Sequence, residues 1–213
     1  MNALQLVNSV LRRIRETEVV DFSASYTKLI LDFINETKRE VEDAWDWSSL
    51  RSTISIPTDT VNKDYSVTGA GQRYRILSAY NTTNLSLLNL TDRSSILQQQ
   101  QIGNSSPSVP YSYAVTGQDA SLDPIISFGD VPNGIYTLKF NLIVPQNDLA
   151  ITTDTLTVPW YPVVQGAWAR AISERGEDGG QNTSEQYQMY VSSLADAIAQ
   201  DAGRIGETIW TQV

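Results

Sequence analysis

The first 45 residues carry the apolar spacing of two amphipathic helices. In residues 2–15, Leu4, Val7, Leu11 and Ile14 recur three or four residues apart, and Asn2 is suited to cap the helix. A second, longer helix is predicted over residues 25–45, with Lys38, Arg39, Glu40 and Glu42 largely off its apolar side. That side holds Tyr26, Leu29, Ile30, Phe33, Ile34, Val41, Ala44 and Trp45. Because each stripe needs a partner and the connection is short, the two helices are expected to pack together.

From residue 53 the apolar period changes to two, which indicates β-strands. Short strand-like runs follow at 64–68, 73–80 and 85–90, and residues 94–102 suit either a short helix or a loop. A hairpin is predicted between Ile125 and Val144, because Asn133-Gly134 can adopt the positive φ angles of a tight turn. Its second strand alternates, and a further strand of the same sheet is expected at 111–115. The alternating residues are Tyr136, Leu138, Phe140, Leu142 and Val144.

Two more helices are predicted near the C-terminal end. Pro159 and Pro162 fit only the first turn of a helix, and Gly176 suits its end. The predicted stripe of this helix is Tyr161, Val164, Trp168, Ala171 and Ile172. Gly166 and nearby alanines would let another helix approach closely. The last helix is expected to present Tyr187, Tyr190, Val191, Leu194 and Ile198 on one face, up to Gly203.

The element order predicts an α+β fold. Two helices at either end are too few for separate cores, so we expect one helical bundle with an antiparallel β-sandwich or small barrel inserted between its halves. The expected boundaries are 1–50 for the N-terminal helical pair, 51–157 for the β domain, 158–203 for the C-terminal helical pair and 204–213 for a tail.

The amino-acid composition limits which catalytic and metal-binding groups this protein can use. The sequence has 213 residues, no cysteine and no histidine, which removes thiol nucleophiles, thiolate metal sites and the usual proton shuttle near neutral pH. The remaining carboxylates are scattered through turns or, as with Asp43 and Asp46, suit a solvated capping role. A glycosidase pair from distant strands stays possible, but nothing selects it. We therefore expect no enzyme, no cofactor and no metal.

The charge is acidic and uneven. The chain has 24 acids against 15 bases, a formal net charge of −9, which argues against sequence-specific nucleic-acid binding. Arg12, Arg13 and Arg15 lie near the N-terminus, whereas no base occurs between Arg93 and Lys139. This asymmetry is explained either by ordinary solubility or by a polarised subunit whose acidic wall lets DNA slide past. No apolar run is long enough to span a membrane, and no signal peptide is evident at the N-terminus, so we expect a chain that is made and works outside a secretory route.

The tail and three tryptophans are the candidate contact residues. The tail either folds back on its own core or orders against a partner, and an apolar set with a tryptophan suits the second role. The tail residues are Ile205, Ile209, Trp210 and Val213, and the candidate structural anchors are Trp45, Trp47 and Trp168.

In this order of elements the chain resembles the head-to-tail adaptors of tailed bacteriophages, also called connectors or tail tubular A-like proteins. The N-terminal resemblance lies in 6–11, in 34–47 with its aromatic end, and in the strand 53–57 that follows. The stronger C-terminal resemblance lies in 110–115, 134–138, 153–159 and 166–171, and ends with a helix containing Tyr187-Gln188. The region 98–101 has no counterpart.

The resemblance implies a structural virion protein of the neck. It implies a homo-oligomeric ring of about twelve copies. The ring would bind the portal protein on one side and a nozzle or tail-tube protein on the other, leaving a channel for genome DNA. The alternative is a carbohydrate-binding or polysaccharide-degrading β-sandwich of a phage tail, which would need exposed Trp or Tyr on the β region.

Overall fold

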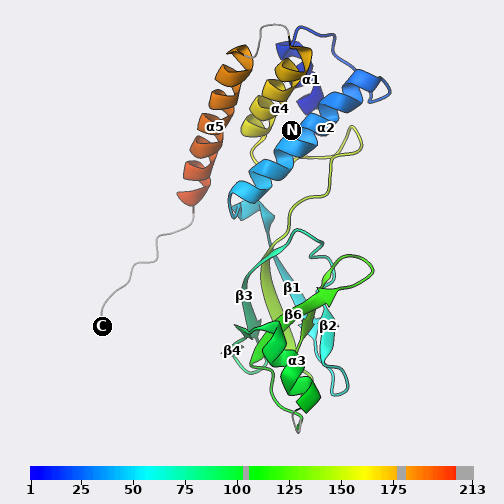
Figure 1. The fold of residues 1–213 in the computed structure, drawn as a ribbon, viewed down its shortest axis with the longest axis vertical. Coiled ribbons are helices and arrows are strands. Elements are labelled where there is room, and N and C mark those ends of the chain that lie inside the picture. The colour runs from blue at the N-terminus through cyan, green and yellow to red at the C-terminus, as the bar shows by residue number, and fades with distance from the viewer. Residues whose placement is uncertain (103–105, 177–180, 205–213) are drawn as a thin grey trace, which may run out of the picture. The chain divides into compact units, whose positions relative to one another are not determined.

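The fold is α+β, as predicted, with five α-helices and two four-stranded sheets in the described part of the chain (Figure 1). The structure is a computed structural model that describes residues 1–102, 106–176 and 181–204. It divides into two compact units, one made of Met1–Leu50 with the chain from Gln146 onward, the other of Arg51–Pro145. The first unit is thus assembled from two separate stretches of sequence.

The helical unit is arranged around α4. It contains α1 (Ala3–Arg13), α2 (Ser25–Ala44), the 3₁₀ turn η1 (Ser48–Leu50), α4 (Trp160–Arg175) and α5 (Gln181–Ala202). Helix α4 packs against α1, α2 and α5, and Figure 1 shows it between α2 and α5. Local signals set two of the boundaries as predicted. Asn2 forms a capping box with Gln5 at the start of α1, and Gly176, at φ 63°, ends α4 in the left-handed conformation.

The predicted one-sided stripe of α4 is wrong. Val163, Val164, Ala167, Ala169 and Ala171 are all buried, whereas Tyr161 from the predicted stripe is exposed. Because α4 has neighbours on several sides, its small and apolar residues are buried around most of its circumference.

The close approach predicted for α4 is confirmed at Gly166. A Cβ atom built on this glycine would lie 2.5 Å from Cγ2 of Thr37 on α2 and 3.1 Å from Cδ2 of Tyr190 on α5. One missing side chain therefore allows both neighbouring helices to reach α4 at the same level.

The β unit contains two sheets and one helix. Their orders are β1-β8-β3-β4 and β2-β7-β6-β5, antiparallel except for the β5–β6 pair. The strands are β1 (Arg51–Pro57), β2 (Asp64–Ser66), β3 (Arg75–Asn81), β4 (Ser86–Leu87), β5 (Asn89–Leu90), β6 (Ser112–Gln118), β7 (Pro124–Ser127) and β8 (Thr137–Ile143).

Both sheets contribute to one apolar core. The alternation predicted for β8 is confirmed, since Leu138, Phe140 and Leu142 are fully buried. Tyr113 of β6 packs edge-on against Phe140, with ring centroids 5.3 Å apart. This contact joins the core faces of the two sheets.

The predicted hairpin between Ile125 and Val144 is wrong. Strands β7 and β8 belong to different sheets, and so do β6 (with Tyr111 just before it) and β8. The connection does not turn back tightly, since Asn133 and Gly134 do not adopt the positive φ angles of such a turn, and it is bonded to Ser108. The Ser108 amide donates to Val131 O (3.0 Å) and its carbonyl accepts from the Asn133 amide (3.0 Å).

The glutamine-rich segment is a helix, α3 (Arg93–Ile102), one of the two forms left open by the sequence. Gln99 lies against Gly129, where a Cβ would come within 2.1 Å of its Oε1 atom. Gln100 donates from Nε2 to the Phe128 carbonyl at 2.8 Å. These glutamines attach α3 to the segment after β7.

Replacing Gly166 with alanine is expected to destabilise the helical unit by about 1–3 kcal/mol, because the added methyl must displace Thr37 or Tyr190. This exceeds the helix-propensity gain of up to about 1 kcal/mol. Urea unfolding followed by tryptophan fluorescence measures the unit selectively, since every tryptophan lies outside residues 51–145.

The control is the double variant Gly166→Ala/Thr37→Ser, which removes the contacting methyl and keeps the hydroxyl. It should recover most of the loss. Equal destabilisation of the single and double variants would contradict the steric explanation.

Candidate interaction site

Two of the three candidate anchors lie near the end of α2. Trp47 is almost fully buried, and its indole donates to the Val41 carbonyl at 2.6 Å. Trp45 is half-buried and donates from Nε1 to Asp201 Oδ2 at 3.2 Å. The third, Trp168 of α4, lies under the Arg13 guanidinium, 5.7 Å from the ring centroid. Their role as structural anchors stays a prediction. The contacts show which group each tryptophan binds: a carbonyl of α2, a carboxylate of α5 and a guanidinium of α1.

Asp201 fastens the end of α5 to the turn after α2. Its carboxylate accepts from the Ser48 amide (2.9 Å), the Ser48 hydroxyl (2.5 Å) and the Trp45 indole. Burial alone would raise the pKa of Asp201, but hydrogen bonds from Ser48 and Trp45 outweigh it and hold that pKa below the ordinary value. The ionised form is therefore the one that the fold stabilises.

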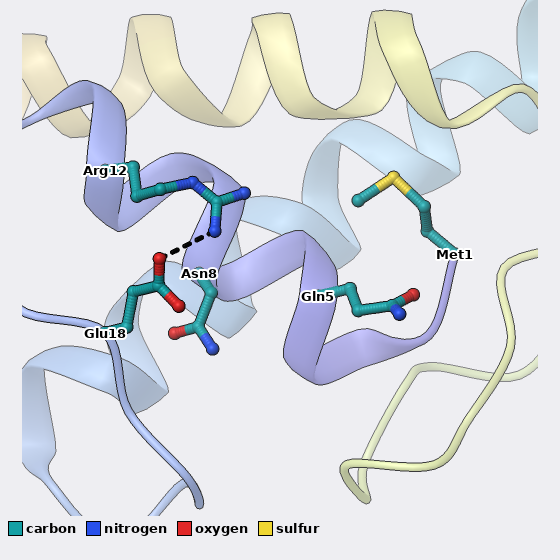
Figure 2. A pocket seen from close by; sticks show the side chains of 5 residues that line it. All are labelled: Met1, Gln5, Asn8, Arg12 and Glu18. Carbon is teal, nitrogen blue, oxygen red and sulfur yellow. Dashed lines mark hydrogen bonds and ion pairs between the residues drawn. The ribbon is translucent and has the colours of Figure 1, made fainter.

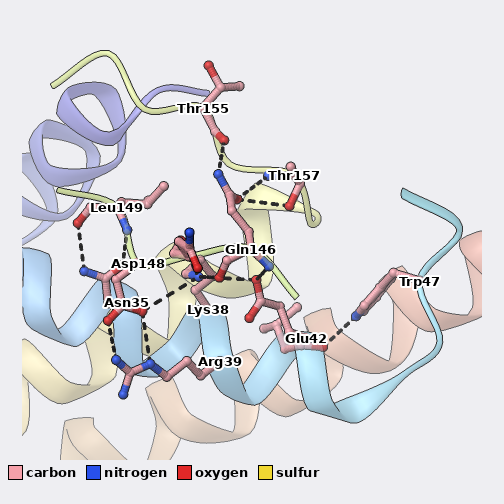
Figure 3. Close-up of polar contacts among 12 residues, drawn as sticks. Asn35, Lys38, Arg39, Glu42, Trp47, Gln146, Asp148, Leu149, Thr155 and Thr157 are labelled. Carbon is pink, nitrogen blue, oxygen red and sulfur yellow. Dashed lines mark hydrogen bonds and ion pairs between the residues drawn. The ribbon is translucent and has the colours of Figure 1, made fainter. Parts of the chain in front are cut away.

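A buried ion pair lies on α2, contrary to the expectation that Lys38 and Glu42 would be off its packed side. Both side chains are fully buried, with Lys38 Nζ 3.3 Å from Glu42 Oε1 (Figure 3). The ammonium also donates to the carbonyls of Gln146 (2.7 Å) and Asn147 (3.0 Å). Glu42 Oε1 accepts from the Gln146 amide at 3.1 Å. A charged pair this deep is tolerated because backbone groups satisfy it.

These contacts belong to a longer series that secures residues 146–157 to the helices. Asn35 exchanges two hydrogen bonds with the Leu149 backbone, and the Gln146 side chain bridges Thr155 and Thr157 (Figure 3). The segment groups with the helical unit, whereas the sequence placed it in the β domain up to residue 157. The polar side chains of α2 are the reason for the difference.

Helix α5 has an apolar stripe that does not coincide with its buried face. Tyr190, Ser193, Ala197 and Asp201 form the buried face, so the predicted single face is wrong. Tyr187 and Val191 are 55% and 48% exposed. With Leu194 and Ile198, both half-buried, they continue at spacings of four, three and four residues, which place them along one side of a helix. We call Tyr187, Val191, Leu194 and Ile198 the α5 stripe.

A hollow of about 360 Å³ lies on the outer side of α1. Figure 2 shows its lining, where Arg12 pairs with Glu18 at 2.8 Å. Asn8 fixes the facing segment through two hydrogen bonds with the Val19 backbone, each 2.9 Å. The lining residues are Met1, Gln5, Asn8, Arg12 and Glu18. The hollow thus combines alkyl, amide and cationic groups.

A second hollow, of about 240 Å³, lies on the β unit and includes Tyr111, Gln99 and Asp130. Tyr111 is 59% exposed, which meets the requirement for an exposed aromatic set by the glycan-binding alternative. Gln99 donates to Asp130 Oδ2 at 3.0 Å, so these two polar groups already satisfy each other in part.

Metal-binding groups and membrane-spanning helices were sought in residues 1–102, 106–176 and 181–204. Within them no group of acidic residues is arranged to hold a metal ion, and no helix is both long and apolar enough to cross a bilayer. The tail candidates Ile205, Ile209, Trp210 and Val213 lie outside the described residues. The sequence patterns missed Asp201 and the Lys38–Glu42 pair. A Lys and a Glu four residues apart beside an apolar stripe are a signal that could have indicated the pair, whereas the partners of Asp201 lie about 150 residues away.

The helical unit is thus a set of packed helices fastened by buried polar groups, with an apolar stripe left at the surface of α5. The family model of the SU10 adaptor protein matches residues 1–209, and the chain belongs to this family. The resemblance to phage head-to-tail adaptors is thereby confirmed. A search of curated proteins gives no match.

Replacing Lys38 with methionine is expected to cost the helical unit about 3–5 kcal/mol, because Glu42 would remain as a buried charge without its cation. Urea titration followed by tryptophan fluorescence measures the loss. Adding Glu42→Gln to this variant removes that charge and should restore part of the stability. If the double variant loses as much as the sum of both single changes, the pair does not act as a unit.

Asp201→Asn is expected to lower stability by about 1–3 kcal/mol at neutral pH, because hydrogen bonds to a charged acceptor are replaced by weaker ones. Since the folded pKa of Asp201 is depressed, its contribution is complete above the unfolded pKa near 4 and is lost as pH falls through the folded value. The difference between wild type and variant should therefore shrink in acid. The exposed Asp196→Asn is the control, and a pH-independent difference would refute this account.

Proposed function

We propose that this chain is a head-to-tail adaptor that forms a ring of about twelve copies by repeated heterologous contacts. The ring binds the portal protein on one side and a nozzle or tail-tube protein on the other, and encloses the channel through which genome DNA leaves the capsid. The protein acts in the neck of the virion as a structural, non-enzymatic component without a cofactor.

The observation that carries this proposal is the α5 stripe. A helix whose inner face is already packed retains apolar side chains outside, at Tyr187 and Val191. Exposed apolar side chains in a continuous row are typical of protein contact surfaces. Family membership over residues 1–209 supplies the context in which that contact is made.

The proposed architecture gives each unit a task. The helices from the two ends of the chain form one bundle that builds the ring, and the β unit is a sandwich inserted between them. Residues 204–213 form a docking tail that orders against the portal or the tail protein through Ile205, Ile209, Trp210 and Val213. The excess of acids over bases, 24 against 15, suits a channel wall that repels DNA and lets it slide.

Mixing the purified chain with the portal encoded in the same genome should give rings seated on the portal in negative-stain images, with about twelve-fold symmetry. A chain ending at Gly203 is the matched variant. It should keep its far-UV circular dichroism spectrum and thermal transition while failing to dock. A truncated chain that unfolds, or that docks normally, would contradict the role of the tail.

The glycan-binding alternative has one observation in its favour, the hollow beside exposed Tyr111. The same imaging experiment separates the two functions. Absence of portal binding in every buffer, together with retention on a polysaccharide column that Tyr111→Ala abolishes, would replace the adaptor proposal with the alternative.

A further inference from the structure

We propose that Asp201 is the positioning residue of the docking tail. By binding the turn after α2, Asp201 fixes the place at which the chain leaves the helical unit after Gly203, so that the tail starts from a defined point when it meets its partner. This inference rests on the proposed docking role of residues 204–213 and names the described residues on which that role depends.

The end of α5 extends past α4. Helix α5 has 22 residues and α4 has 16. The two helices lie side by side and run in opposite directions, and α5 continues beyond the start of α4 (Figure 1). At 1.5 Å per residue the difference in length is about 9 Å. Asp201 lies in this last part of α5, where a contact with another element is needed to hold the helix.

The Asp201 carboxylate makes that contact with the turn after α2. Its Oδ2 atom accepts from the Ser48 amide at 2.9 Å and from the Trp45 indole at 3.2 Å. Its Oδ1 atom accepts from the Ser48 hydroxyl at 2.5 Å. The side chain is only 5% exposed. Several hydrogen bonds that converge on one buried, ionised acceptor are strong and fix its direction as well as its distance.

The turn that receives Asp201 is itself firmly held. Trp47 and Leu50, on either side of Ser48, are both buried. The Trp47 indole donates to the Val41 carbonyl on α2 at 2.6 Å. The contact with Asp201 therefore fixes the end of α5 to the body of α2.

The position of this charge is unfavourable for the helix alone. The C-terminal end of a helix carries a partial negative charge, which a carboxylate in the last turn opposes. The contact with Ser48 and Trp45 is a sufficient reason for an acid at this position. The same residue also contacts the start of the tail, since the Arg204 amide donates to the Asp201 carbonyl at 3.1 Å and Arg204 Nη1 lies 3.9 Å from Asp201 Oδ1.

A defined starting point matters because the proposed ring presents many tails at once. Several tails can bind a partner together only if their geometry allows simultaneous contact. A tail that starts from a fixed point also loses less conformational freedom when it binds. Asp201 would thus raise the affinity of docking without touching the partner.

A four-residue Gly-Ser insertion between Gly203 and Arg204 tests position while leaving the Ser48 and Trp45 contacts in place. The full chain with this insertion should unfold in urea as the wild type does. Its binding to the immobilised portal encoded in the same genome, measured by biolayer interferometry, should be weaker by about tenfold or more. The same four residues added after Val213 are the control and should leave binding unchanged.

The second variant is Asp201→Ala, which removes the acceptor of all three hydrogen bonds and keeps a good helix former. It should weaken portal binding as much as the insertion does, and the two changes together should cost no more than either alone, because both act on the starting point of the tail. Gly166→Ala, which destabilises the same unit away from this turn, is the control and should bind as the wild type does at a temperature where each variant is folded.

The outcomes separate this inference from the proposed function. Normal binding of the insertion variant, while the chain ending at Gly203 fails to dock, would overturn the inference and leave the adaptor function standing. Equal losses for Asp201→Ala and Gly166→Ala would also overturn it, since stability rather than position would then control binding. If the full chain does not bind the portal, both proposals fail.

Discussion

The helical unit depends on the burial of one ammonium group. Lys38 is enclosed completely, and an amine at that depth must be surrounded by acceptors or its desolvation would unfold the site. Its partners are Glu42 on the same helix, the carbonyls of Gln146 and Asn147, and the carboxylate of Asp148. The two carbonyls can reach the amine only if the chain, on leaving β8, lies directly along α2. One buried charge therefore fixes the point at which the chain returns to the helices.

The path of residues 146–157 and the position of α4 follow from this return point. The segment runs from Gln146 through Leu149, held by Asn35, to the start of α1, where the Ala3 amide donates to the Asp154 carbonyl at 2.8 Å. Helix α4 then begins at Trp160, and Gly166 brings it close to Thr37 on α2 and Tyr190 on α5. Polar contacts set the direction of the chain, and small side chains then set the distance between helices.

Sequence patterns predicted the features that depend on neighbours along the chain. The Asn2 cap, the Gly176 ending and the alternation of β8 are local, and all three are confirmed. The strand partners were not predictable, because β7 and β8 pair with different strands and the partners of β8, β1 and β3, lie much earlier in the sequence. The buried Lys38 was missed for a similar reason, since two of its acceptors, the carbonyls of Gln146 and Asn147, lie more than a hundred residues later. On α5 the apolar row and the buried residues are different sets. The exposed part of that row is the candidate contact surface, the α5 stripe.

The division of the helical unit between both ends of the sequence has a consequence for its synthesis. The β unit is one continuous stretch and has all its strands as soon as Pro145 has left the ribosome. Helices α1 and α2 are made first, yet the backbone carbonyls that enclose Lys38 and the helix that covers Thr37 are translated only after the β unit. Until then the earliest part of the chain exposes its apolar sides and holds its ammonium in water. The helices that are made first are therefore the last to be covered, because their packing against α4 can form only on a nearly finished chain.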